Sequence, residues 1–215
     1  MWSSDVIILY LFAYLLGSIP TAVWIGKVFY GIDVREHGSH NAGATNTYRV
    51  LGRKAAIPVL LIDIIKGFTA TSLIHLYPDL IPNNTSTFVL VKAICGSFAV
   101  VGHLFPVFAG FRGGKGVATM FGLVIGLFPQ AAAIAFLGFV LAYSLTSYVS
   151  LGSIVASFVF AGSVIFLFQD DRTAMIVFCI LQFSLILFTH RKNVKRLWRG
   201  EEKKIQIFSS KRNLQ

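Results

Sequence analysis

The chain has 215 residues, of which 55% are hydrophobic and only 13% are charged. A soluble domain of this length needs far more polar surface, so the composition excludes an ordinary soluble enzyme and indicates a single polytopic membrane domain over residues 1–215. The net charge of +10 favours anionic headgroups or anionic substrates at one face. Nucleic acid is a poor alternative, because the basic residues lie in short segments beside apolar runs.

Apolar runs divide the chain into candidate transmembrane helices. Crossing a bilayer takes about 20 apolar residues, and runs close to that length span about 5–27, 55–77, 87–108 and 173–189. The 54 residues from Gly116 to Gln169 contain no Lys, Arg, Asp, Glu or His. As one helix they would extend about 80 Å, far beyond a hydrocarbon core of ~30 Å, so this stretch must fold back.

The charges at the ends of these runs predict their orientation. The loop 27–54 and the tail after Thr189 are rich in Lys and Arg, with nine in the tail, so both are expected in the cytoplasm. The segment 78–86 carries only Asp79 and is expected outside, as is Asp170-Asp171-Arg172 before the last run. The uncharged stretch must then cross an odd number of times.

Three short crossings satisfy this parity, with breaks at Pro129 and at the polar patch 146–153. The predicted fold is an all-α polytopic membrane protein. It is a seven-transmembrane-helix bundle with the N-terminus outside and the C-terminus cytoplasmic. All the polar, glycine-rich segments then converge on the cytoplasmic side.

Three features within the predicted helices favour structural roles. In the first run, the sequence from Gly17 to Thr21, GSIPT, predicts a kink at which Ser18 and Thr21 satisfy backbone groups freed by the proline. In the second run, Asp63 and Lys66 stand three residues apart and can neutralise one another. The two cysteines, Cys95 and Cys179, lie in different runs and are expected to be buried thiols.

The segment FRGGKGVAT, residues 111–119, predicts an anion site. It is not a nucleotide P-loop, because Ala109 and Gly116 stand where that motif needs Gly and Ser or Thr. Glycines nevertheless let successive N–H groups point inward, and a helix N-terminus that follows favours negative charge. Lys115 adds a mobile cation and Arg112 a second one. The alternative is a flexible turn with cations at the interface.

Two further segments carry candidate chemistry. Residues 36–55 are rich in small hydrogen-bond donors for phosphate or hydroxyl oxygens, and these include Ser39, Asn41, Thr45 and Asn46, with Arg49 as a charged donor. Residues 189–204 close the last predicted helix. If that helix extends past the membrane, His190 and Asn193 share one face, while Arg191 and Lys195 lie on another and meet headgroups. The alternatives are an ordinary polar loop and a positive-inside tail.

Together these segments resemble the bacterial membrane glycerol-3-phosphate acyltransferases that use acyl phosphate as donor (the PlsY type). The resemblance covers nearly the whole chain. It is carried by GSIPTA at 17–22, GSHNAGATN at 38–46, DIIKG at 63–67, GHLFPVFAGFRGGKGVAT at 102–119, SLGS at 150–153 and HRKNVKRLWRGEE at 190–202. One departure is His40, where the family usually has glycine, so the backbone of that loop is less certain.

The resemblance implies the reaction and the residues that carry it. The family transfers a fatty acyl group to the sn-1 hydroxyl of glycerol 3-phosphate at the cytoplasmic side of the inner membrane, giving lysophosphatidic acid and phosphate. The implied catalytic residues are Lys115, His190, Asn193 and Ser153. The implied substrate-binding residues are Ser39, Asn41, Thr45, Asn46, Arg49, Arg112, Gly113, Gly114, Gly116, Ser150 and Glu202. The sequence leaves open which of Ser150 and Ser153 faces the site, and it leaves the oligomeric state open.

Several chemistries are not expected. Acyltransferases with thioester donors often carry H-x-x-x-x-D, but none of the five histidines has Asp five residues later. A G-x-S-x-G elbow is also absent, so a serine nucleophile has no support in the sequence. We therefore expect direct transfer from acyl phosphate, with no cofactor and no metal. The alternative function is a transporter of a phosphorylated metabolite or anion, against which stands the absence of an internal repeat.

Overall fold

The computed structural model describes residues 4–77, 81, 85–170 and 172–205, and all regular structure in these residues is helical. Asp79 and Asp171 lie outside the described residues. The helices are α1 (Ser4–Gly17), α2 (Thr21–Tyr30), η1 (Val34–Glu36), α3 (Ala44–Leu51), α4 (Arg53–Ser72), η2 (Leu73–Leu76), α5 (Ser86–Leu104), η3 (Val107–Ala109), α6 (Val117–Leu127), α7 (Pro129–Thr146), α8 (Val149–Gly162), η4 (Ser163–Leu167), α9 (Thr173–Thr189) and α10 (Arg191–Trp198).

The uncharged stretch folds back as three helices, α6, α7 and α8, and the two predicted break points are confirmed. Pro129 begins α7, because its missing N–H costs nothing in a first turn and its φ suits a helix. At the second break, α7 ends at Thr146 and α8 begins at Val149. Ser147 between them has a positive φ of 62°, which reverses the chain within two residues.

The helices differ in whether their length and composition suit a membrane crossing. Within the described residues, five segments are able to span a membrane by length and composition: Ser4–Tyr30, Arg53–Leu76, Ser86–Ala109, Pro129–Thr146 and Val149–Leu167. A sixth is possible if α9 and α10, which are bent by 62°, form one span. Helix α6 has 11 residues, short of the roughly 20 that a span requires. The count of seven and the orientation of the termini therefore stay predictions.

The first apolar run is broken between α1 and α2, as its proline predicts. The hydrogen bonds that stabilise the break differ in part from those predicted. Ser18 Oγ is buried without a hydrogen-bond partner, so its predicted role is wrong. Thr21 Oγ1 lies 3.5 Å from the Ile19 carbonyl, as predicted, and 3.1 Å from Asp63 Oδ1, and Lys66 Nζ donates to the Ile19 carbonyl at 3.0 Å. The predicted Asp63–Lys66 pair is confirmed at 2.9 Å and is buried. Helix α4 thus braces the broken helix with a neutralised ion pair.

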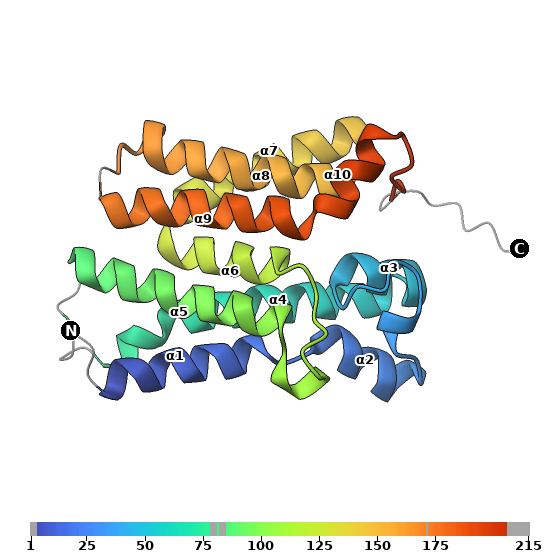
Figure 1. Ribbon diagram of the computed structural model, residues 1–215, viewed down its shortest axis with the longest axis horizontal. Coiled ribbons are helices and arrows are strands. Elements are labelled where there is room, and N and C mark those ends of the chain that lie inside the picture. The colour runs from blue at the N-terminus through green and yellow to red at the C-terminus, as the bar shows by residue number, and fades with distance from the viewer. Residues whose placement is uncertain (1–3, 78–80, 82–84, 171, 206–215) are drawn as a thin grey trace, which may run out of the picture.

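Two large apolar cores hold the described part of the bundle together, and a smaller one lies among α2, η1 and α4. One of the large cores lies among α1, α4 and α5, and the other among α5, α6, α7, α8 and α9. Helix α5 contributes to both, with Cys95 in the first core, while Cys179 of α9 lies in the second; both thiols are free and buried, as predicted. In Figure 1, α2, α3, α10 and the segment between α5 and α6 gather at the end opposite the N-terminus. We call this the polar end of the bundle.

Candidate active site

The loop Gly113–Gly116 packs against the C-terminal end of α5. The Gly114 N–H donates to the His103 carbonyl at 3.1 Å. A Cβ at Gly113 would lie 2.0 Å from that carbonyl oxygen, and one at Gly114 would lie 2.2 Å from His103 Nε2. Gly116 has φ +77° and caps α6. The glycines are therefore required for a close approach, which fixes the backbone on both sides of Lys115.

His103 connects this loop to the brace beneath it, a link that sequence reasoning missed. Its Nδ1 lies 3.6 Å from Asp63 Oδ1, and the side chain is buried. The same ring therefore contacts the Asp63–Lys66 pair on one side and Gly114 on the other. An ionisable residue inside the predicted third helix, ten positions before Gly113, was the available signal.

Lys115 takes part in a hydrogen-bonded cluster built from four distant segments. Its Nζ donates to Asn193 Oδ1, and Asn193 Nδ2 donates to Glu202 Oε1 at 2.6 Å. Ser150 Oγ donates to the same carboxylate oxygen at 2.7 Å, and Arg196 Nε donates to Glu202 Oε2 at 2.6 Å. We call these five residues the Glu202 cluster. Residues separated by up to 87 positions along the chain, from 115 to 202, thus meet at the polar end.

The cluster carries more positive than negative charge. Burial lowers the pKa of the Lys115 ammonium to about 8; Glu202 opposes this shift, while Arg196 and Arg49 add to it. Burial likewise lowers the pKa of Arg49, which remains a cation close enough to feel Glu202 and Arg196. Burial alone would raise the pKa of Glu202, but hydrogen bonds from Asn193, Ser150 and Arg196 hold it below its ordinary value. Three cations therefore surround one carboxylate.

The C-terminal segment after α10 is held in place by bonds to the turn between α7 and α8. The Ile205 N–H donates to the Ser147 carbonyl at 3.0 Å, and Tyr143 OH donates to the Ile205 carbonyl at 2.7 Å. Both Glu202 and Ile205 are buried. These contacts keep the Glu202 carboxylate inside the cluster, and no sequence pattern predicts them.

His190 marks a bend that the sequence did not predict. The sequence leaves open whether the last helix continues past the membrane; α9 ends at Thr189, and α10 leaves it at 62°. The bend keeps His190 and Asn193 buried while Arg191 and Lys195 stay exposed, so the predicted separation of faces is confirmed.

The contacts of His190 assign its tautomer. Its Nδ1 lies 2.9 Å from the Ile186 carbonyl, which can only accept a hydrogen bond. The proton of a neutral ring therefore belongs on Nδ1, leaving Nε2 as an acceptor.

The two candidate serines of α8 have different partners. Ser150 Oγ bonds to Glu202, whereas Ser153 Oγ donates to the Val149 carbonyl of its own helix at 2.8 Å. Both are buried and lie three residues apart, on one face of α8. Ser150 is thus part of the Glu202 cluster, and Ser153 lies one turn further into the bundle.

The first polar loop is organised by Asn46. Its Oδ1 accepts from the Ser39 N–H at 2.7 Å and from Ser39 Oγ at 3.0 Å. Its Nδ2 donates to the carbonyls of Val34 and His37 at 2.7 and 3.1 Å. Asn46 is 1% exposed, so its amide shapes the loop from within.

The other predicted residues of this loop are more open. Asn41, Thr45 and Arg49 are half-buried. His40, the departure from the family pattern, has φ +58°, a conformation that glycine adopts easily, and its Nδ1 contacts the Arg35 carbonyl at 3.1 Å.

Two basic residues lie in unexpected places relative to the Glu202 cluster: Arg112 is outside it and Arg196 is part of it. Arg112 is exposed, and its charge is not among those that shift the pKa of Lys115. Arg196, to which the sequence analysis assigned no role, pairs with Glu202. Its position three residues after Asn193 places both on one helix face, so the spacing rule applied to His190 would have found it too.

This arrangement suits an anionic ligand. Lys115, Arg49 and Arg196 supply positive charge, the loop glycines expose backbone, and Ser150 and Asn193 supply polar groups that can exchange partners. Within the residues that the structure describes, no three His, Cys, Asp or Glu side chains lie together as metal ligands would.

Comparison with known proteins points to one family. A family model described as glycerol-3-phosphate acyltransferase matches residues 7–200. The glycerol-3-phosphate acyltransferase of Listeria monocytogenes strain EGD-e is 43% identical over 203 residues, covering 94% of this chain and 98% of that protein. The Staphylococcus carnosus protein of the same name is 42% identical over 202 residues, with the same coverage.

Solved structures agree with these relatives. The crystal structure of PlsY, an integral membrane glycerol 3-phosphate acyltransferase, matches in its glycerol 3-phosphate form with a TM-score of 0.83 and 34% identity, covering 94% of this chain and 96% of that one. Its lysophosphatidic acid form matches with a TM-score of 0.79 and 33% identity, at the same coverage.

Proposed function

The chain belongs to the glycerol-3-phosphate acyltransferase family, and we propose that its donor is acyl phosphate. The proposed reaction transfers the fatty acyl group to the sn-1 hydroxyl of glycerol 3-phosphate and releases lysophosphatidic acid and phosphate. The observation that carries this proposal is the Glu202 cluster, in which Lys115 of the glycine loop joins Asn193, Ser150 and Glu202.

Both proposed substrates carry a phosphate, and the cluster is suited to phosphates. Each brings about two negative charges near neutral pH, against three cations and one carboxylate in the protein. Lys115 and the adjacent N-terminus of α6 favour one phosphate. Arg49, with Ser39 and Asn41 of the first loop, is proposed to bind the other, and Asn46 keeps Ser39 in position.

The reaction can proceed without a covalent enzyme intermediate. The sn-1 oxygen attacks the acyl carbonyl carbon, a new ester C–O bond forms, and the bond from that carbon to the phosphate oxygen breaks. The phosphate leaves with the bonding electron pair, and Lys115 stabilises its developing charge. The hydroxyl proton passes to the departing phosphate, while Nε2 of His190 accepts a hydrogen bond that orients the hydroxyl. Atoms and charge balance without a cofactor.

We also propose that the polar end faces the cytoplasm of a bacterial cell with the chain in its inner membrane, since Lys and Arg dominate that end. Arg53 and Lys54 begin α4 there and are exposed, whereas exposed Leu76 lies at the opposite end of the same helical segment. A cysteine at Lys54 should be labelled from the cytoplasmic side and one at Leu76 from outside, in a background with Cys95 and Cys179 replaced by serine. Labelling in the reverse sense would overturn this orientation.

The donor is tested with purified protein in detergent. Acyl phosphate and acyl-coenzyme A are supplied separately with glycerol 3-phosphate, and the protein is then analysed for bound acyl groups after incubation with donor alone. We expect lysophosphatidic acid from acyl phosphate, little from the thioester, and no acylated protein. Efficient use of acyl-coenzyme A, or a stable acyl-serine, would refute direct transfer. A transporter, the alternative, would form no new lipid in detergent.

A further inference from the structure

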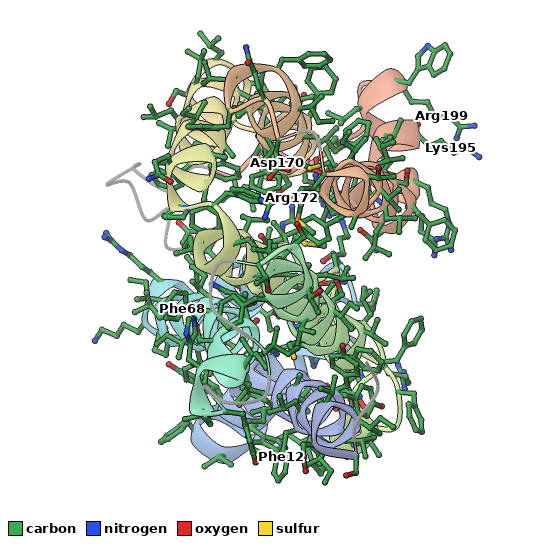
Figure 2. The ribbon with its side chains drawn as sticks, turned by 90° about the vertical axis from the view of Figure 1, so that its left-hand side faces the viewer. Phe12, Phe68, Asp170, Arg172, Lys195 and Arg199 are labelled. Carbon is green, nitrogen blue, oxygen red and sulfur yellow. The ribbon has the colours of Figure 1, made fainter. Side chains whose placement is uncertain are left out.

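The outer face of α10 is a cationic and apolar surface that the proposed reaction does not use. Arg191, Lys195 and Arg199 recur every four residues and so form one stripe. Beside the stripe lie Val194, 38% exposed, and Trp198, 91% exposed. These five residues line a surface hollow of about 440 Å³. Figure 2 shows Lys195 and Arg199 extending away from the bundle.

The charges of this face have no carboxylate partner in the described part of the chain. Every ion pair found there involves other cations, and on α10 itself only Arg196 is paired, to Glu202 on the inner side. Arg191 lies over the Phe188 ring at 4.3 Å and donates to the Phe188 carbonyl at 3.2 Å. The stripe therefore begins at the end of α9 and continues outward with two unpaired cations.

The bend at His190 places the outer face of α10 near the membrane surface. If α9 crosses the bilayer, a helix leaving it at 62° runs close to the membrane surface. Helices that lie in this interface place cations next to headgroups and Trp at the boundary with the acyl chains. A soluble anion would satisfy Lys195 and Arg199 but would leave Trp198 and Val194 exposed to water. A phospholipid satisfies both kinds of side chain.

We infer that the outer face of α10 binds an anionic phospholipid, with the headgroup phosphate between Lys195 and Arg199 and the acyl chains against Trp198 and Val194. This lipid is a ligand distinct from the substrates. The opposite face of α10 supplies Asn193 and Arg196 to the Glu202 cluster. A lipid that fixes the outer face therefore also fixes the orientation of these two side chains, so lipid composition should affect the site through α10.

The test uses the full-length protein in detergent micelles with spin-labelled phosphatidylglycerol or phosphatidylcholine, and measures the relative association of the two lipids. Lys195→Gln/Arg199→Gln should reduce the preference for phosphatidylglycerol about 25-fold, since each cation near an anionic surface contributes about fivefold. Added salt should weaken the wild-type preference. Neither residue belongs to the proposed reaction site, so this measurement stands even if the donor proposal fails.

A matched control separates a site from diffuse attraction. Arg53→Gln/Lys54→Gln also removes two exposed cations at the polar end, and it should change the preference by less than twofold. The thermal midpoint of the wild type should rise with added phosphatidylglycerol, whereas that of Lys195→Gln/Arg199→Gln should not. Equal losses in both double variants, or no lipid preference in the wild type, would overturn the inference.

Discussion

Two polar segments close the same end of the bundle and use similar side chains in opposite ways. In residues 33–49, the Asn46 amide bonds only to groups of its own segment, and Asp33 pairs with Arg35 two residues away. In residues 190–205, the Asn193 amide bonds across the molecule, to Lys115 and Glu202. An amide satisfied within its own loop shapes backbone, whereas one that bridges separate elements joins a site. Composition alone does not distinguish the two.

The largest effect on turnover is expected at Lys115, where residues 190–205 contact the glycine loop. Lys115→Met removes the charge proposed to stabilise the leaving phosphate, so turnover should fall about 10²–10³-fold. Arg112→Met removes an exposed cation three residues away and should cost far less. Turnover and extraction of folded protein are measured for both variants. Near-normal turnover in Lys115→Met would remove Lys115 from the reaction.

A second test concerns the packing of the loop on His103. Gly114→Ala should lower activity by up to about 10²-fold, because its Cβ would fall 2.2 Å from His103 Nε2 and shift Lys115. Adding His103→Ala should restore part of this loss. Gly113→Ala should not be rescued, because its Cβ meets the backbone carbonyl of residue 103. The activities of the two glycine variants are measured with and without His103→Ala. Equal rescue of Gly113→Ala and Gly114→Ala by His103→Ala would contradict the geometry.

The comparison of the two amides is tested by the same substitution in each. Asn193→Asp places a second carboxylate beside Glu202 and should lower turnover about tenfold or more. Asn46→Asp removes the donor to the Val34 and His37 carbonyls, which costs roughly 1–3 kcal/mol of stability when buried acceptors are left unpaired. It should therefore lower the thermal midpoint more than Asn193→Asp does. A lower thermal midpoint for Asn193→Asp than for Asn46→Asp would contradict the distinction between an amide that shapes a loop and one that bridges separate elements.

The charge of Lys115 predicts a pH dependence. With a pKa of about 8, the ammonium is present below pH 8 and is lost as pH rises through that value. The ratio kcat/KM should therefore fall about fivefold between pH 8 and 9, in a range where substrate phosphates have already ionised. Lys115→Arg should move this limb beyond pH 10, because a guanidinium stays protonated. A pH limb unchanged in Lys115→Arg would assign it to another group.

The smallest effect is expected at Glu202. Glutamine in its place can still accept from Ser150 and Asn193 but loses the charge that pairs with Arg196, whose side chain is 39% exposed. Thermal stability should fall by roughly 1–2 kcal/mol, and activity should fall as Asn193 loosens. Glu201→Gln, an exposed neighbour, is the control. Equal midpoints in the two variants would show that Glu202 contributes nothing beyond surface charge.

The sequence predicted what depends on composition and local chemistry. Hydropathy and Pro129 placed the breaks of the uncharged stretch, and spacing predicted the Asp63–Lys66 pair. The bend at His190 was missed because no proline or glycine marks it, and the contact of Asn193 with Lys115 that accompanies it is tertiary. The partner of Ser150 was equally invisible, because it depends on how the tail folds back over the bundle.

The order of these segments along the chain bears on how the protein is made. The ribosome delivers residues 33–49 first, then the glycine loop, then Ser150, and only afterwards α10 and Glu202. Translation that stops after α9 yields a product with its apolar helices complete, ready for insertion, but with Lys115 and Arg49 facing no carboxylate. Such a product lacks Asn193, so on the proposed mechanism we expect it to be inactive. Synthesis would therefore have to pass α10 before activity can begin, and residue 202 before the Glu202 cluster is complete.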